Sequence, residues 1–261
     1  MTDTDSPMPV VAAIDGSDTA IHAALWAIDE AIARSVPLRL VYVTKATHPS
    51  ADDYYADIHH AETSIRAAQD AVEATGRPVK IETAILSGLP AVSLIAESQD
   101  ADMVCVGSVG IGRYARAILG STATELAEKA RCPVAIIRPQ GEMPRGATPW
   151  VVVAVTDEPD NESVVQQALD EARLRQAPVL MLGKRDGLDD IVAQSKARYP
   201  ELHVYPVANS ADVARFLRKH DESVQLAVIG GSRADEVMQI LGPQGHPLLR
   251  RTAASVLVVR H

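Results

Sequence analysis

The eleven residues AIDEAIARSVP, at positions 27–37, return later in the chain as ALDEARLRQAP, at positions 168–178. The two stretches share six identical residues at the same spacing, and a shift of 141 positions (168 − 27) superimposes them. Each stretch also follows an apolar run of strand length, residues 10–14 in the first case and 150–155 in the second. The chain therefore contains a tandem duplication of one unit that begins with a strand and a helix.

The ends of the two copies and the segment between them define two domains. The apolar runs PVAIIR, residues 133–138, and SVLVVR, residues 255–260, close the copies. Residues 139–149 contain three prolines and two glycines without apolar periodicity, which is typical of a linker. A chain of 261 residues has room for two small domains, which we place at residues 1–140 and 150–261.

Strands and helices alternate in both copies. In the first copy we expect strands at 10–14, 38–43, 79–85, 102–106 and 133–137, and helices near 18–35, near 54–75, after Pro90 and near 121–131. In the second copy we expect strands near 151–155, 179–182, 202–207, 225–229 and 256–259, and helices near 162–175, 188–198, 210–220 and 247–253. Near-continuous apolar strands predict a doubly wound α/β fold with a parallel sheet in each copy.

The first expected helix shows how such an element is recognised. Ser17 is a candidate N-cap, because its hydroxyl can accept from the free N–H groups of the first turn. Apolar residues of this helix recur three, four or seven positions apart and predict one buried stripe. The stripe comprises Ile21, Ala24, Leu25, Ile28 and Ile32.

Composition and charge exclude several classes of protein. The apolar runs are shorter than the ~18 residues of a membrane span, and a net charge of −9 with 3% aromatic residues argues against a nucleic-acid binder. The two cysteines cannot build a disulfide framework or a CxxC metal site; we expect Cys105 in the core and Cys132 partly exposed. With an acidic, polar start that lacks the features of a secretory signal, this composition predicts a cytoplasmic location without membrane or nucleic-acid partners.

A glycine-rich loop after the fourth strand carries the main functional signal. Gly107 and Gly110 allow a tight turn whose N–H groups can approach a ligand. Gly120 precedes Ser121 and Thr122 at an expected helix N-terminus, where free N–H groups and the helix dipole favour phosphate. Arg113 lies within the loop and can offset phosphate charge.

The topology predicts that a second turn meets this loop. In an open parallel sheet, ligands bind beyond the carboxyl ends of the strands, where the strand order reverses. There Asp15 is placed to orient a ribose hydroxyl or to hold a Mg²⁺ ion bound to phosphates. The backbone around Val41 would form an apolar wall for a base. The alternative is that the loop is a plain connector, because neither GxxxxGK[ST] nor a post-strand GxGxxG that opens the first helix is present.

These residues resemble the universal stress protein family. The spacing from Gly107 and Gly110 to Gly120-Ser121, the opening VVAAIDGS at 10–17 and the closing CPVAII at 132–137 look like that family, and the resemblance covers both copies, as in the tandem actinobacterial type. It implies a Rossmann-like fold of the adenine nucleotide alpha hydrolase type, with strand order 3-2-1-4-5 and bound ATP. The implied contacts are Asp15, Val41, Gly107, Gly110, Gly120, Ser121 and Thr122, with Ala13 and Arg113 as further candidates.

The second copy departs from this pattern. Gly230-Gly231-Ser232-Arg233 follows the fourth strand, but Arg233 or Ala234 stands where the first copy has the second glycine of its motif, Gly110. Thr156 stands at the position of Asp15, and Pro243 replaces Ser121. Proline supplies neither the N–H nor the hydroxyl of serine. We therefore expect one competent site, in the first domain, and one degenerate site.

Three functions remain open from the sequence. The first is a regulatory ATP-binding protein with slow or no hydrolysis, because no residue is placed as an evident base. For this function the resemblance implies a role in stress response, dormancy or growth control and association through the fifth strands, whose apolar edges need cover. We expect a homodimer and a regulatory protein partner. The second is a slow ATPase or an adenylyl-transfer enzyme, and the third is a scaffold that has lost nucleotide binding.

Overall fold

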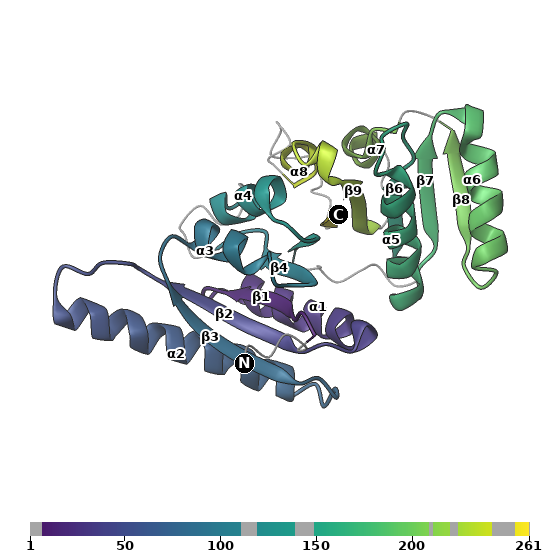
Figure 1. The fold of residues 1–261 in the computed structure, drawn as a ribbon. Helices are drawn as coiled ribbons and strands as arrows, with labels where there is room; N and C mark the ends of the chain where they lie inside the picture. The colour runs from purple at the N-terminus through teal and green to yellow at the C-terminus, as the bar shows by residue number, and fades with distance from the viewer. Residues whose placement is uncertain are drawn as a thin grey trace, which may run out of the picture. The chain divides into compact units, whose positions relative to one another are not determined.

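Each half of the chain folds into a parallel five-stranded sheet with helices on both faces (Figure 1). The computed structural model describes residues 7–110, 119–138, 149–208, 211–219, 224–241 and 254–260. The chain divides into two units, residues 1–138 and 139–260. The predicted linker lies almost entirely outside the described residues, and so do Arg113, Pro243 and the helix expected near 247–253.

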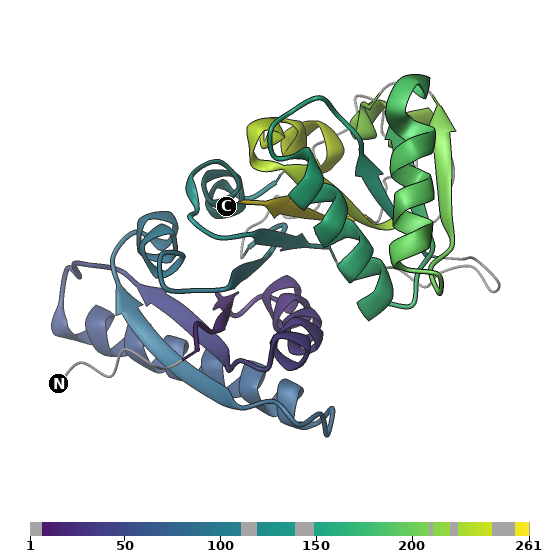
Figure 2. The ribbon, with the colours of Figure 1, turned by 45° about the vertical axis from the view of Figure 1, so that its right-hand side comes forward.

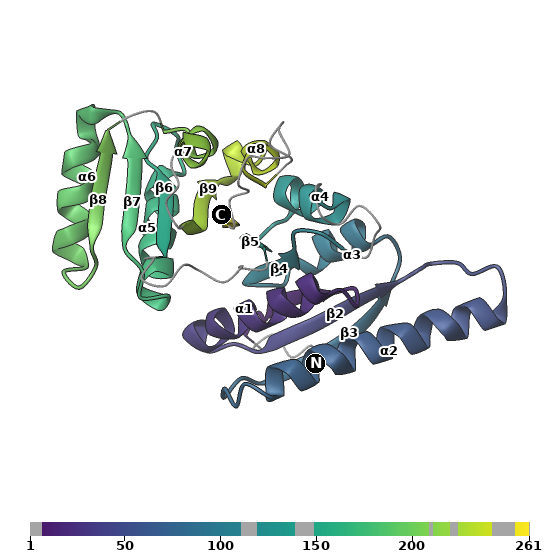
Figure 3. The ribbon, with the colours of Figure 1, turned by 180° about the vertical axis from the view of Figure 1, so that it is seen from behind.

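The first unit has the predicted strand order, β3-β2-β1-β4-β5. Its strands are β1 (Val10–Ile14), β2 (Leu38–Thr44), β3 (Ile81–Ser87), β4 (Met103–Gly107) and β5 (Val134–Ile137), and all its strand pairs are parallel. Its helices are α1 (Asp18–Arg34), α2 (Ala51–Glu73), α3 (Pro90–Glu97) and α4 (Ser121–Lys129). Helices α1 and α2 contact each other on one face of the sheet, and α3 and α4 contact each other on the opposite face (Figure 3).

The second unit repeats this order, as β8-β7-β6-β9-β10. Its strands are β6 (Trp150–Ala154), β7 (Val179–Gly183), β8 (Val204–Ala208), β9 (Val224–Gly230) and β10 (Ser255–Val259), again paired in parallel. Its helices are α5 (Asn161–Leu174), α6 (Arg185–Arg198), α7 (Val213–Lys219) and α8 (Glu236–Leu241), drawn in green to yellow in Figure 2. A 3₁₀ turn, η1 (Gly231–Arg233), follows β9. The predicted doubly wound fold with order 3-2-1-4-5 is therefore confirmed in each unit.

Most strands of both sheets are apolar because helices cover both faces of each sheet. Every residue of β1, β5, β7 and β10 is buried. The expected stripe on α1 was wrong in part, because Ile21, Leu25 and Ile32 are only half-buried. The fully buried face is instead made of Ala20, Ala23, Ala24, Ala27 and Ala31 with Ile28, which lets α1 approach the sheet closely.

The residues shared by the two copies form the frame of each unit. Glu30 pairs with Arg34 at 3.6 Å, and the equivalent Glu171 pairs with Arg175 at 2.9 Å. Both glutamates are buried, at 2% and 1% exposure. The shared prolines use their carbonyls to start the sheet: the Val10 N–H donates to Pro37 at 2.9 Å, and the Val151 N–H donates to Pro178 at 3.0 Å. The repeat therefore preserves a buried ion pair and a strand start.

The first helix of each unit also ends in the same way. Ser35 after α1 and Gln176 after α5 are 141 positions apart, and both have a positive φ, of 58° and 51°. In each case the next N–H reaches back into the helix, from Val36 to the Ala31 carbonyl at 3.0 Å and from Ala177 to the Ala172 carbonyl at 2.9 Å. This is a left-handed helix end built without glycine.

Two expectations need correction. Helix α8 and the η1 turn were not predicted, because a six-residue helix gives too little apolar periodicity to be recognised. Cys132 is buried, at 6% exposure, although a position before proline at a strand entry favoured partial exposure; Cys105 is buried as expected. Within the described ranges, no helix is long and apolar enough to cross a membrane.

Candidate functional site

A cavity of about 540 Å³ lies at the carboxyl edge of the first unit's sheet. Residues from the ends of β1, β2 and β4, from α3 and from the start of α4 line it. They include eight of the nine predicted site residues: Ala13, Asp15, Val41, Gly107, Gly110, Gly120, Ser121 and Thr122. The ninth, Arg113, lies outside the described residues. Turns that are distant in sequence thus meet at one place, as the topology requires.

The turn between β1 and α1 holds Asp15 in a fixed orientation. One carboxylate oxygen, Oδ1, accepts from the Ser17 N–H at 2.9 Å and from the Ser17 hydroxyl at 2.6 Å. Ser17 also caps α1 as predicted, because its oxygen accepts from the Ala20 N–H at 3.2 Å. These bonds occupy Oδ1 and leave Oδ2 on the side of the glycine-rich loop, next to Gly110.

Packing within the protein requires both glycines after β4. A Cβ at Gly107 would lie 2.9 Å from the Thr19 backbone, and a Cβ at Gly110 would lie 2.6 Å from Asp15 Oδ2. Both distances are shorter than a Cβ tolerates. The two glycines therefore let α1 and the Asp15 turn approach the loop, whether or not a ligand is bound.

The start of α4 presents backbone donors to the cavity. Gly120 is the N-cap residue, and its own N–H donates to the Ser108 carbonyl at 2.9 Å. Among the described residues no side chain caps this helix, which leaves its first-turn N–H groups available for an anion. A Cβ at Gly120 would meet nothing closer than 3.7 Å, so the protein itself leaves room for a side chain here.

The opposite wall of the cavity is apolar. Val41 lines it as predicted, and Val43, Pro90 and Leu94 extend it. Sequence reasoning did not name Val43, although it lies closer to the carboxyl end of β2 than Val41 does. Tyr42 lies between the two valines; burial, with Asp57 and Asp15 nearby, raises the pKa of its phenol, which therefore stays neutral at physiological pH.

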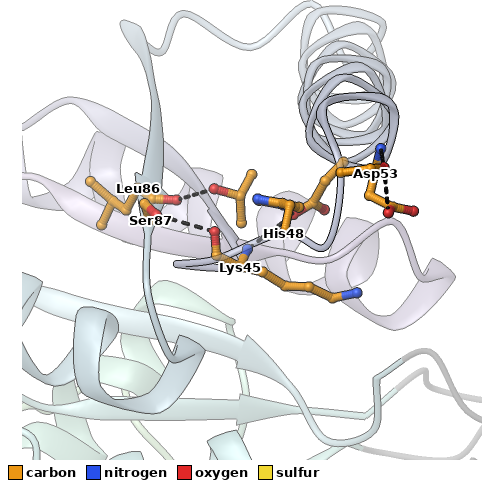
Figure 4. A network of polar contacts seen from close by, with 8 residues as sticks. Lys45, His48, Asp53, Leu86 and Ser87 are labelled. Carbon is orange, nitrogen blue, oxygen red and sulfur yellow. Dashed lines mark hydrogen bonds and ion pairs between the residues drawn. The ribbon is translucent and has the colours of Figure 1, made fainter.

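Polar contacts hold the connection between β2 and α2 at this edge of the sheet (Figure 4). Asp57 Oδ2 accepts from the Lys45 N–H at 3.0 Å and contacts His48 Nε2 at 2.8 Å. The hydrogen bond from His48 lowers the pKa of Asp57. Ser50 caps α2 and donates to Asp53 at 2.7 Å. These contacts fix the segment that follows the apolar wall.

The described side chains of the cavity carry no positive charge that could balance a bound phosphate. Among the described lining residues, Asp15 is the one with a carboxyl group, and none has a cationic side chain. The described residues contain no cluster of three or more His, Cys, Asp or Glu side chains that could bind a metal ion by themselves. A polyphosphate at this edge would need Mg²⁺ beside Asp15, or a cationic side chain.

The equivalent edge of the second unit is built differently. Asp160, at the position of Thr19, places its carboxylate against Gly230 at the end of β9. Leu188, which is buried, fills the space beside Gly183, where a Cβ would lie 3.2 Å from its side chain. The residues that follow β9 form the η1 turn, and Arg233 pairs there with Glu236. The second unit thus has a carboxylate and a 3₁₀ turn where the first has a hydroxyl and a glycine loop, and Leu188 packs beside the end of β7.

Comparisons with known proteins identify the family. The model of the universal stress protein family matches residues 8–138. The universal stress protein Rv2624c of Mycobacterium tuberculosis (strain H37Rv) is 55% identical over 260 residues, which cover 96% of each chain. A universal stress protein structure from Archaeoglobus fulgidus aligns over 97% of this chain and 96% of its own, with a TM-score of 0.70 at 17% identity, and so shares the fold.

A universal stress protein solved in complex with cAMP is 26% identical and aligns with 52% of this chain and 100% of its own length, at a TM-score of 0.42. Because the family model and the mycobacterial relative both match, the chain belongs to the universal stress protein family.

Proposed function

We propose that the first unit binds one ATP molecule in the cavity at its sheet edge, and that the chain is a regulatory nucleotide-binding protein. The observation that carries this proposal is the meeting of three features on one cavity of about 540 Å³: an apolar wall, an oriented carboxylate and an uncapped helix N-terminus. Pockets of about 300–1,000 Å³ with a few placed polar groups are typical of small-ligand sites.

Each part of a nucleotide has a counterpart in the lining. The apolar wall at Val41 and Val43 suits the base, and Asp15 Oδ2 suits a ribose hydroxyl. The backbone N–H groups at the start of α4, with the hydroxyls of Ser121 and Thr122, suit phosphate oxygens. Mg²⁺ would offset the charge between Asp15 and the phosphates, since it commonly binds one carboxylate together with substrate phosphates.

One nucleotide per chain follows from the contrast between the units. The second unit has Thr156 and Asp160 in place of Asp15 and Thr19, and Leu188 packs beside Gly183 at the end of β7, the strand that corresponds to β2. It therefore lacks the carboxylate that we propose to orient a ribose hydroxyl. We infer that the second unit serves the fold and the assembly rather than nucleotide binding.

Gly120→Ala is the sharpest test of this proposal. The substitution has room in the protein, so we expect stability to change little and ATP affinity, measured by isothermal titration calorimetry with Mg²⁺, to fall by tenfold or more. Gly76→Ala is the matched control. Gly76 lies in open space after α2, far from the residues that line the cavity, and has a φ of 66°. An alanine there strains the backbone without touching the candidate site. It should lower stability and leave ATP affinity unchanged.

The identity of the ligand needs a direct assay. Mass spectrometry of nucleotides released from natively purified protein should detect ATP, and titrations with ATP, ADP and cAMP should rank ATP first. If cAMP bound more tightly than ATP in these titrations, cAMP would be the better candidate for the ligand. Absence of binding by all three would favour a scaffold, and steady-state phosphate release above about 1 s⁻¹ would favour an enzyme.

The proposed assembly and regulation extend this function. Each unit has its fifth strand, β5 or β10, at the end of its own strand order, and apolar strands of this kind favour association. We propose that the chain forms a homodimer through these strands in the cytoplasm and that nucleotide occupancy changes its affinity for a protein partner. Light scattering with and without ATP tests the dimer; a monomer under both conditions would exclude it.

A further inference from the structure

The hydroxyl of Thr19 connects α1 to the glycine-rich loop. Thr19 Oγ1 donates to the carbonyl of Val109, a residue 90 positions away. It also lies 2.9 Å from Ser17 Oγ, which in turn donates to Asp15 at 2.6 Å. Thr19 is not among the residues that line the cavity. The Val109 carbonyl therefore points toward the first turn of α1 and not toward the candidate phosphate position.

The direction of this carbonyl determines the direction of the next N–H. In a trans peptide the C=O and N–H groups lie in one plane and point in opposite directions. With its carbonyl held by Thr19, the Val109–Gly110 peptide directs the Gly110 N–H away from α1. The Gly110 nitrogen lies 3.9 Å from where a Gly120 Cβ would be, which places it beside the N-terminus of α4. The N–H is thus available on the side where the anion is expected.

Without this bond the peptide has an alternative orientation. Rotation of the peptide plane changes ψ of Val109 and φ of Gly110, and glycine permits φ values that other residues avoid. The rotated peptide would direct a carbonyl oxygen at the phosphates in place of an N–H. Such a change replaces an attractive contact with a repulsive one at the same position.

We propose that Thr19 is a positioning residue for the phosphates, and that it acts by holding the Val109–Gly110 peptide with its N–H toward the ligand. This inference rests on the proposed nucleotide site and assigns a role within it to a residue that does not touch the ligand. The second unit has Asp160 at the same position of the repeat. An ionised aspartate accepts hydrogen bonds but cannot donate one, so it cannot hold a carbonyl in this way.

The test compares ligands with and without phosphates. In the full-length chain, Thr19→Val removes the hydroxyl and keeps the side-chain shape, and we expect ATP affinity to fall by about tenfold or more while adenosine affinity stays within about twofold. Thr19→Ser keeps the hydroxyl and should restore ATP affinity to within about threefold of the wild type. Thr63→Val, at an exposed position on α2, is the control for loss of a threonine hydroxyl and should bind both ligands as the wild type does.

The possible outcomes separate this inference from the proposed function. Unchanged ATP affinity in Thr19→Val, or equal losses for ATP and adenosine, would overturn the positioning role even where the wild type binds ATP. If the wild type bound no nucleotide, the proposed function would fail and the phosphate-positioning role of Thr19 would fail with it. A crystal structure of Thr19→Val tests the mechanism separately: a rotated Val109–Gly110 peptide would support the hold of Thr19 on this peptide, and an unchanged peptide would overturn it.

Discussion

The two units share a frame but differ at the sheet edge where a ligand would bind. In both, the first helix carries a buried glutamate paired with an arginine and ends in a left-handed residue two positions before a proline. At the carboxyl edge, the first unit has Asp15, Thr19 and an open cavity, whereas the second has Thr156, Asp160 and Leu188. Identity between repeats therefore marks the residues that fold the unit, and differences between them mark the candidate site.

Gly107 and Gly230 show why this distinction matters. Both end the fourth strand of their unit, and each lies under the first helix, against Thr19 in one case and Asp160 in the other. A glycine that recurs in both units is thus explained by packing between helix and strand. Gly120, which has free space around it, is the better indicator of a ligand.

The buried ion pair gives the largest expected difference between the units. Glu171→Ala leaves the Arg175 guanidinium, whose side chain is 8% exposed, without its carboxylate, and should destabilise the second unit by about 3 kcal/mol or more. Glu30→Ala should cost less, because Arg34 is 25% exposed and lies 3.6 Å from Glu30. Each unit contains one tryptophan, Trp26 or Trp150, so urea unfolding in single-tryptophan backgrounds follows each unit separately. Equal losses in the two units would contradict the contrast in burial.

The glycines give the next largest difference. Gly107→Ala brings a Cβ to 2.9 Å from the Thr19 backbone and should destabilise the first unit by about 2 kcal/mol. Gly230→Ala meets the end of the Asp160 side chain, which can rotate, and should cost about 1 kcal/mol. Gly120→Ala should stay within about 0.5 kcal/mol of the wild type. Denaturant midpoints would measure all three, and a large loss in Gly120→Ala would show that this glycine is also structural.

The sequence predicted the frame well because its signals are local and repeated. Strand-length apolar runs, the Ser17 cap and the 141-residue offset were sufficient for the strands and for most helix positions, whereas the strand order was predicted from the family resemblance. The alanine face of α1 was missed because alanines give a weak periodic signal beside isoleucine and leucine. Asp15 and the glycine loop were brought together as predicted, whereas Thr19 was not recognised, since its partner Val109 is 90 positions away.

The left-handed helix ends should respond equally in the two units. Ser35 and Gln176 have positive φ angles of 58° and 51°, which strain any residue with a side chain. Ser35→Gly and Gln176→Gly should each relieve this strain, because glycine adopts such angles without a steric penalty. We expect a gain of about 0.5–1 kcal/mol in the free energy of unfolding of the corresponding unit. Thermal unfolding of each variant would measure it, and a gain in one unit alone would show that the two ends differ in strain.

The smallest expected difference concerns acid stability. The pKa of Asp57 is lowered in the folded unit by the His48 hydrogen bond, so Asp57 stabilises the first unit above its unfolded-state pKa. That contribution is lost as the pH falls through the lowered pKa. We expect Asp57→Asn to reduce the decline in the first unit's stability between about pH 5 and about pH 2, with the second unit as the internal control. An unchanged pH profile in the first unit would contradict a role for the pair.

The stoichiometry of ATP binding tests the central claim most directly. Titration calorimetry of the intact chain with ATP and Mg²⁺ should give one site per chain, and Gly120→Ala should weaken that site without revealing a second. Two equivalent sites, or one site that Gly120→Ala leaves intact, would contradict the assignment of nucleotide binding to the first unit alone.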